Sequence, residues 1–148
     1  MPMYVTINKE VFLALPLFIL CGSVMTRGAI AQRLINVMKS LTSPMPGGMA
    51  VATILSCAVF AAISGSSPVT LLAIGAVMYP ALVKEGYSKP FSLGTVASGG
   101  TLGIIIPPSI PMILYGIVTE TSIVGLFIAG IIPGILLTVV LSSYCVLA

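Results

Sequence analysis

Uncharged and mostly apolar stretches dominate the chain. They occupy residues 11–26, 40–83, 90–119 and 121–148, and each is close to or longer than the roughly 20 residues that cross a bilayer. Hydrophobic residues make up 58% of the 148 residues and charged residues only 6%, against about 25% in an ordinary soluble domain. The pattern predicts an all-α integral membrane protein, because helices satisfy their own backbone hydrogen bonds in lipid.

The first stretch, Val11 to Thr26, predicts a helix that crosses the bilayer once and stops at Arg27. The next segment, 29–41, has the period of an amphipathic helix. Its predicted apolar face carries Ile30, Leu34, Val37, Met38 and Leu41. Its predicted polar face carries Gln32, Arg33, Asn36 and Lys39. This arrangement is typical of a helix that lies in the membrane interface.

The second stretch, 40–83, is long enough for two passes but contains helix-breaking residues at its midpoint, in the segment Ile63-Ser64-Gly65-Ser66-Ser67-Pro68. Ser66 or Ser67 can cap a second helix whose first turn holds Pro68. The first arm, Gly48 to Ile63, would be about 24 Å long, which is short of a hydrocarbon core of about 30 Å. Two interpretations remain: two ordinary spans joined by an extramembrane turn, or a re-entrant hairpin whose tip ends inside the bilayer.

The charged residues favour the re-entrant hairpin, because we expect two full spans to place Lys84 and Lys89 on the side opposite Arg27, Arg33 and Lys39. In that arrangement five of the six basic residues lie on one side, namely Arg27, Arg33, Lys39, Lys84 and Lys89. Only Lys9, Glu10 and Glu120 lie on the opposite side. The positive-inside rule makes the basic side cytoplasmic. We therefore expect both flanks of the hairpin to face the cytoplasm.

The third stretch, 90–119, predicts a broken transmembrane helix. Pro107 and Pro108 have no N–H, so the carbonyls of Gly103 and Ile104 lose their helical partners. Irregular backbone at membrane depth is tolerated only where it lines a cavity or is buried in protein. We expect a helix, a break and a second half-helix that starts near Ser109. The fourth stretch predicts a plain transmembrane span.

Side chains that usually carry catalysis are scarce. The chain has no His, and its three acidic residues all lie at segment boundaries, so no membrane-embedded carboxylate can relay protons. A zinc site would lack His ligands, and a serine nucleophile would lack a neighbouring base. A net charge of +3 without a dense basic run argues against a nucleic-acid partner. The cysteines are interpreted as core packing: Cys21, Cys57 and Cys145. We expect neither enzyme activity nor a cofactor.

The chemistry that remains is that of backbone and hydroxyl groups at the two helix breaks. Carbonyls at a helix C-terminus, together with Ser or Thr hydroxyls, form an oxygen site suited to Na⁺. The half-helix N-termini near Ser67 and Ser109 would expose N–H groups suited to an anionic substrate such as a carboxylate. Each motif alone could be a simple turn or kink. Paired helix breaks are typical of the central site of a secondary transporter.

Short motifs along nearly the whole chain indicate a resemblance to a known family. They are Gly65-Ser66-Ser67, Ala73-Ile74-Gly75, Pro80, Gly86-Tyr87, Gly100-Thr101-Leu102-Gly103, Ile105-Ile106-Pro107-Pro108-Ser109, Tyr115-Gly116 and Leu126-Phe127-Ile128-Ala129-Gly130-Ile131-Ile132-Pro133-Gly134. Together they resemble the large membrane subunit of tripartite ATP-independent periplasmic (TRAP) transporters, the DctM-like family. The Ile-Ile-Pro-Pro-Ser and Ala-Gly-Ile-Ile-Pro-Gly motifs are the most specific.

This resemblance implies an elevator-type secondary transporter of the bacterial inner membrane, in which the hairpin and the broken helix form half of a mobile transport domain. It implies Na⁺-coupled uptake of organic acids, such as dicarboxylates or sialic-acid-like solutes. A periplasmic solute-binding protein would deliver the solute, and a small membrane subunit would brace the scaffold in the lipid bilayer. Carried over by motif, the Na⁺ site would use oxygens of Ser64, Ser66, Gly103, Ile106 and Pro108.

The expected organisation has three parts: a scaffold span with the interfacial helix at 1–47, a transport-domain half at 48–120 with hairpin 48–83 and broken helix 90–119, and a transmembrane span at 121–148. Members of the family carry a second, inverted copy of the hairpin and broken helix. The chain corresponds to about one such repeat, so we expect it to hold one half-site and to need the missing second half for transport. The alternative function is that of a truncated, non-transporting structural or assembly subunit, which would show no Na⁺-dependent stabilisation.

Overall fold

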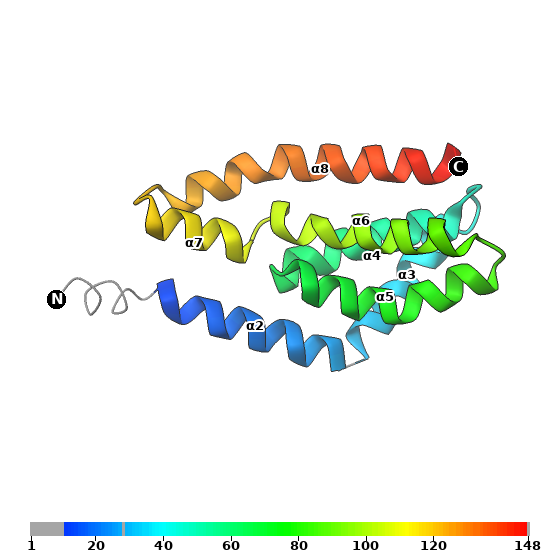
Figure 1. Ribbon diagram of the computed structural model, residues 1–148, viewed down its shortest axis with the longest axis horizontal. Coiled ribbons are helices and arrows are strands. Elements are labelled where there is room, and N and C mark those ends of the chain that lie inside the picture. Colours follow the sequence, from blue (N-terminus) through cyan, green and yellow to red (C-terminus); the bar gives the residue numbers. More distant parts are fainter. Residues whose placement is uncertain (1–10, 28, 148) are drawn as a thin grey trace.

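The computed structural model describes residues 11–27 and 29–147 (Figure 1). The described part of the chain is helical apart from short connections, and it contains no strand. Its helices are α2 (Val11–Arg27), α3 (Ile30–Thr42), α4 (Gly48–Ser64), α5 (Ser67–Lys84), α6 (Lys89–Ile105), α7 (Ile110–Val118) and α8 (Ile123–Leu147). The predicted all-α class is confirmed, and both predicted helix breaks are present.

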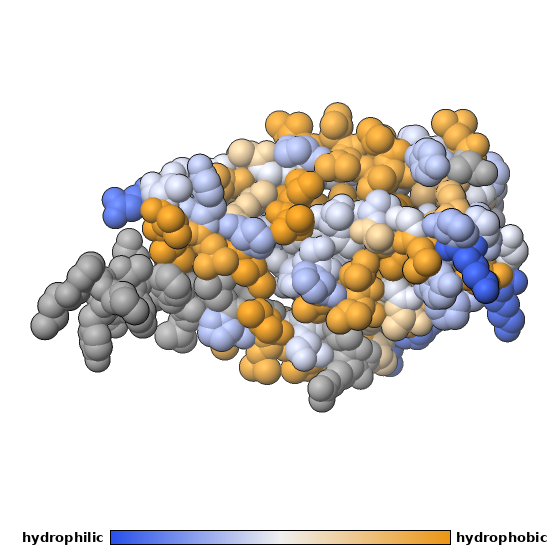
Figure 2. All heavy atoms as spheres, in the orientation of Figure 1, coloured by the Kyte–Doolittle hydropathy of each residue, from blue (hydrophilic) through white to orange (hydrophobic). Residues whose placement is uncertain are grey.

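Three helical segments of the described chain are long and apolar enough to cross a membrane: α5, α6 taken together with α7, and α8. Large apolar side chains cover α8, where Ile132 is 75% exposed and Leu136 is 63% exposed. Figure 2 shows this hydrophobic surface along α7 and α8. An extended apolar surface of this kind marks contact with lipid or with other protein. The chain is therefore an integral membrane protein.

The tip of the α4–α5 hairpin packs against the break between α6 and α7. The backbone N–H of Ile110 donates a hydrogen bond to the carbonyl of Gly65 at 3.0 Å. Helix α6 runs alongside both arms of the hairpin, and α7 continues beyond the tip (Figure 1). Helix α8 then returns along α6 and α4 to the end of the molecule where α6 begins. The two breaks therefore form one junction.

This junction lies part-way along the broken helix, after the 17 residues of α6 and before the 9 residues of α7. If the broken helix crosses the membrane, the hairpin tip lies inside the hydrocarbon. One-sided basic residues do not by themselves separate our two interpretations, because two complete spans would also return the chain to its starting side. The depth of the tip does separate them. The geometry favours the re-entrant hairpin, which stays a prediction along with the three-part organisation.

Helix α3 differs from the two-faced helix predicted from its sequence. Its fully buried residues are Ala31, Ile35 and Thr42. Three residues of the predicted apolar face are instead largely exposed: Ile30, Val37 and Leu41. The helix has one side against protein, one exposed apolar side and one polar side. An exposed apolar side suits the predicted position in the membrane interface, whereas the side buried against protein was not predicted, because its contact partners lie elsewhere in the chain.

The core surrounds the hairpin in two clusters. Phe60, Ile74 and Met78 belong to the cluster between α3, α4 and α5. The cluster between α4, α5, α6 and α8 contains Ile54, Leu82 and Leu102. Two cysteines lie in these clusters as predicted, Cys57 and Cys145. The core-packing interpretation is wrong for Cys21, which is exposed on α2.

Candidate functional site

The first break is a two-residue turn that begins at Gly65. This glycine has a left-handed φ of 61°, and its N–H donates to the carbonyl of Ala61, which ends α4. A Cβ atom at this position would lie 2.7 Å from the carbonyl oxygen of Pro108 in the second break. Glycine therefore serves two purposes here: it terminates the helix, and it allows the second break to approach.

A buried hydroxyl network closes this turn. The Oγ1 of Thr70 donates to the carbonyl of Ser66 at 2.9 Å and lies 2.9 Å from the Oγ of Ser64. The N–H of Thr70 also donates to the Ser66 carbonyl, at 3.1 Å. Both Ser64 and Thr70 are fully buried. Thr70 thus orients two residues predicted to bind the ion. Sequence analysis missed it, although a Thr four residues after a helix-capping Ser often bonds back to that residue's carbonyl.

The second break begins at the end of α6, where the next residues have no backbone N–H to continue the helix. The N–H of Ile106 makes the last helical bond, to the carbonyl of Leu102 at 2.9 Å. Pro107 and Pro108 follow and have no N–H. Within the described residues, the carbonyls of Gly103 and Pro108 accept no hydrogen bond. They are free acceptors, as the sequence predicted for Gly103.

Ser109 ends the second break, but its side chain does not cap α7. It occupies the N-cap position, yet its hydroxyl points back toward α6 and donates to the carbonyl of Ile104 at 2.8 Å. Ile104 is therefore satisfied, whereas we expected its carbonyl to lack a partner. The side chain of Ser109 is fully buried. This residue joins the two halves of the broken helix across the irregular segment.

Gly103 marks a second close approach between the two breaks. A Cβ atom there would lie 2.8 Å from the nitrogen of Ser67 and 2.9 Å from the carbonyl carbon and oxygen of Ser66. Real Cβ atoms do not approach backbone so closely, so any side chain would push the segments apart. The structure therefore brings Ser64, Ser66, Gly103 and Pro108 to one junction. Ile106 forms the C-cap of α6 beside them.

The helix ends at the junction carry opposite partial charges. The C-termini of α4 and α6 present carbonyls, and the N-termini of α5 and α7 present N–H groups. At the start of α7, the N–H of Ile110 is already used by Gly65, and Pro111 has none. The first-turn N–H groups of Ser67, Val69 and Met112 make no hydrogen bond within the described residues. The junction can therefore offer both oxygen ligands and amide donors.

The chain also matches a known protein family over nearly its whole length. The family described as "Tripartite ATP-independent periplasmic transporter, DctM component" matches residues 2–148. The chain belongs to this DctM family. Members of it are transport permeases rather than enzymes, and the chain is accordingly a multi-pass protein of the bacterial inner membrane.

Curated DctM-family relatives support the same conclusion. The chain is 45% identical over 139 residues to the C4-dicarboxylate TRAP transporter large permease protein DctM of Pseudomonas aeruginosa, covering 94% of this chain and 33% of the relative. It is 46% identical over 141 residues to the ectoine TRAP transporter large permease protein TeaC of Halomonas elongata, covering 95% and 33%. It is 44% identical over 141 residues to the isethionate TRAP transporter permease protein DctMQ of Oleidesulfovibrio alaskensis, covering 95% and 22%. The chain thus spans about a third or less of the length of these relatives.

The α8 motif that supported the DctM resemblance also has a structural role. A Cβ atom at Gly130 would lie 2.9 Å from the carbonyl oxygen of Ile105, and one at Gly134 would lie 3.0 Å from the Cγ1 of Ile106. These glycines allow α8 to lie directly against the second break. Sequence analysis treated the motif only as a family signature, because its contact partner is remote along the chain.

Proposed function

We propose that this chain provides half of the ion and solute site of a Na⁺-coupled TRAP permease for organic acids. The observation that carries the proposal is the hydrogen bond from the N–H of Ile110 to the carbonyl of Gly65, at 3.0 Å. It joins the hairpin tip to the second break, so oxygen acceptors and helix N-termini from distant parts of the chain lie together. Paired helix breaks of this kind form the central sites of secondary transporters.

The oxygens at the junction suit Na⁺ as the coupling ion. The carbonyls of Gly103, Ile106 and Pro108 make no hydrogen bond within the described residues. Those of Gly103 and Ile106 lie at the C-terminal, partially negative end of α6. The Ser66 carbonyl and the Ser64 hydroxyl are instead engaged by Thr70. We therefore assign the three carbonyls of the second break as the principal ligands, with Ser64 and Ser66 held in place beside them by Thr70.

Backbone amides would recognise the solute. Ser67 is half-buried at the start of α5, and its N–H and that of Met112 are free to bind a carboxylate oxygen. The relatives described above are named for C4-dicarboxylate and isethionate, both anions, and for ectoine. A dicarboxylate or sialic-acid-like solute fits an anion site built from helix N-termini. Ser109 would act by fixing the start of α7, because its hydroxyl is bonded to Ile104.

The site would be completed by partners. Because the chain spans about a third of its relatives, we propose that a second half of the large subunit supplies the facing half-site. A small membrane subunit would brace the scaffold, and a periplasmic solute-binding protein would deliver the solute. The hairpin and broken helix would then move together in an elevator mechanism, since their tips are bonded to each other.

Uptake assays test this proposal. The complete transporter containing this segment is reconstituted in liposomes, and uptake of a labelled C4-dicarboxylate is measured in the presence of its binding protein. We expect uptake to require an inward Na⁺ gradient and to stop when K⁺ replaces Na⁺. Equal uptake in K⁺ under an imposed proton gradient would contradict Na⁺ coupling. A complete assembly that shows neither uptake nor Na⁺-dependent thermal stabilisation would favour the structural-subunit alternative.

A further inference from the structure

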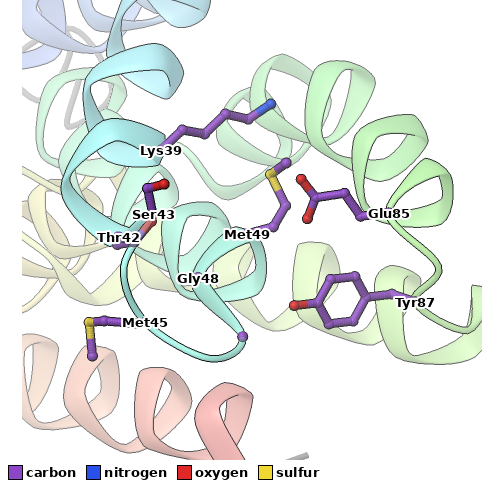
Figure 3. Close-up of a pocket in the computed structure, with 9 residues that line it drawn as sticks. Lys39, Thr42, Ser43, Met45, Gly48, Met49, Glu85 and Tyr87 are labelled. Atoms are coloured by element: carbon purple, nitrogen blue, oxygen red, sulfur yellow. The ribbon is translucent and has the colours of Figure 1, made fainter.

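A polar cavity of about 380 Å³ lies at the base of the hairpin, at the opposite end from its tip. Its charged and phenolic residues come from two places: Lys39 lies on α3, and Glu85 and Tyr87 lie in the connection after α5. The start of α4 forms its floor through Gly47, Gly48 and Met49. Figure 3 shows the Lys39 amine and the Glu85 carboxylate extending toward each other across Met49. The cavity is thus lined by one cationic and one anionic side chain.

Two further features define the polar groups of this cavity. The ring of Tyr87 stacks on Phe91, with centroids 5.5 Å apart, which holds its hydroxyl in position. Burial and the nearby Glu85 carboxylate raise the pKa of Tyr87 above its usual value, so this hydroxyl remains a protonated donor at neutral pH. The N-terminal end of the 17-residue helix α4 adds partial positive charge at the floor.

An apolar groove of about 410 Å³ continues from the cavity. Thr42 and Met45 line both of them. From there the groove follows Val51 and Leu55 along α4 and residues 146 to 138 along α8. Eight residues of helix correspond to about 12 Å, so the groove extends well away from the polar end. Its walls are largely open, since Leu41 is 68% exposed and Val139 is 57% exposed.

The order of these two spaces matches the order of groups in a phospholipid at a membrane surface. Figure 2 shows hydrophilic residues gathered at the end of the molecule where α5 meets α6, next to a surface of hydrophobic residues. A headgroup would lie at that polar end, and an acyl chain would descend along α4 and α8. A water-soluble ligand would use the polar cavity and gain nothing from the groove.

We propose that this cavity and groove bind one phosphatidylethanolamine molecule. Its phosphate lies between Lys39, the Tyr87 hydroxyl and the N-terminus of α4, and its primary ammonium donates to the Glu85 carboxylate. One acyl chain occupies the groove between α4 and α8. Charge complementarity decides the headgroup: phosphatidylglycerol offers Glu85 no cation, and the quaternary ammonium of phosphatidylcholine has no N–H to donate.

Native mass spectrometry of the purified chain tests the proposal, with the chain titrated by phosphatidylethanolamine, phosphatidylcholine and phosphatidylglycerol of identical acyl chains. We expect phosphatidylethanolamine to bind about tenfold more tightly than either competitor, which is the scale of one charge-assisted hydrogen bond. Equal affinity for all three lipids would overturn the proposal. Free phosphoethanolamine tests the groove: if it displaces the lipid at equal concentration, the acyl chain contributes nothing and the proposed occupant is wrong.

Substitutions separate the two charged contacts. Glu85→Gln should remove the preference for phosphatidylethanolamine over phosphatidylcholine while leaving phosphatidylcholine binding unchanged. Lys39→Gln should lower the affinity for both phosphatidylethanolamine and phosphatidylcholine about tenfold, because it removes the phosphate contact. The matched control is Lys84→Gln, since Lys84 is exposed and does not line the cavity. An equal loss with Lys84→Gln would show general attraction to charge and overturn the assigned site. Thermal unfolding of each variant verifies that it remains folded.

Discussion

The break between α4 and α5 is closed by side chains, whereas the break between α6 and α7 leaves backbone carbonyls open. At the first break, Thr70 bonds to both Ser64 and Ser66 and consolidates the turn. At the second, two prolines remove the donors that would have reached Gly103 and Ile104, and only Ile104 finds a replacement in Ser109. One break is therefore held together by its own side chains, and the other offers the carbonyls that we propose as ligands. Substitutions at the two breaks should have different consequences.

The largest effect is expected where the two breaks touch. In a complete reconstituted transporter, Gly103→Val should raise the Na⁺ concentration for half-maximal uptake by more than about tenfold, because overpacking against rigid backbone typically costs about 1–3 kcal/mol. The first atom of the new side chain would already lie 2.8 Å from the nitrogen of Ser67. Gly94→Val is the control, since a Cβ there meets nothing within 4 Å. Unchanged Na⁺ dependence in Gly103→Val would refute the ion site at this junction.

A smaller effect is expected from the hydroxyl network. Thr70→Val removes the hydroxyl but keeps the shape, and it leaves the buried Ser64 Oγ without its close partner, a loss of about 1–3 kcal/mol in unfolding free energy. Thr53→Val is the matched control, because Thr53 is equally buried and bonds only within its own helix, to Met49. Chemical denaturation of the two variants measures the difference. Equal stability of the two threonine variants would show that the network does not hold the turn.

Ser64→Ala should affect Na⁺ dependence less than Gly103→Val does, because the backbone carbonyl of residue 64 remains.

Ser109→Ala should be milder still. Losing the bond to the Ile104 carbonyl frees the start of α7, and we expect uptake to fall several-fold while membrane insertion is unchanged. Ser92→Ala is the control, since Ser92 is also fully buried and its hydroxyl bonds to the carbonyl of Ser88 near the start of α6, far from the junction. Normal uptake by Ser109→Ala would mean that this break is structural only.

The last prediction concerns the depth of the hairpin tip in the membrane. The labels that it uses should leave transport almost unaffected. Nitroxide labels at Ile63 near the tip and at Val118 at the end of α7 report membrane depth through their relative exposure to oxygen and to a water-soluble nickel reagent. A re-entrant hairpin places Ile63 deeper in the hydrocarbon than Val118, because α7 continues beyond the tip. If both labels report the same shallow depth, α4 and α5 are two complete spans.

The positions of the helix breaks could be predicted because their causes are local. A glycine followed by serines and a proline ends one helix and begins the next, and Pro107-Pro108 cannot continue a helix in any surroundings. The predicted arm, Gly48 to Ile63, differs by one residue from α4 as observed. The resemblance to TRAP permeases came from these same local motifs, and the family comparison confirms it.

Features that depend on packing could not be predicted in this way. Ile35 and Val37 are equally apolar, yet Ile35 is buried and Val37 is 54% exposed, because lipid accepts the apolar side chains that water would reject. The bond between Gly65 and Ile110 joins residues far apart in the sequence, and no periodic pattern signals it. The roles of Thr70 and of the Ser109 hydroxyl were missed although their partners lie only four to six residues away, because the acceptor that a hydroxyl reaches depends on how the breaks pack.

The hydrogen bond between the hairpin tip and the second break also bears on the entropy of ion binding. A flexible loop that closed around an ion would have to lose about 1–2 kcal/mol per residue of backbone conformational freedom at that moment. Here the hydrogen bond from the N–H of Ile110 already joins the two segments, and Gly103 has no side chain that would push them apart. The ordering occurs when the protein folds, so the proposed ion would meet a preorganised set of ligands. Its affinity should then depend on the positions of a few oxygens and only weakly on the flexibility of the helices around them.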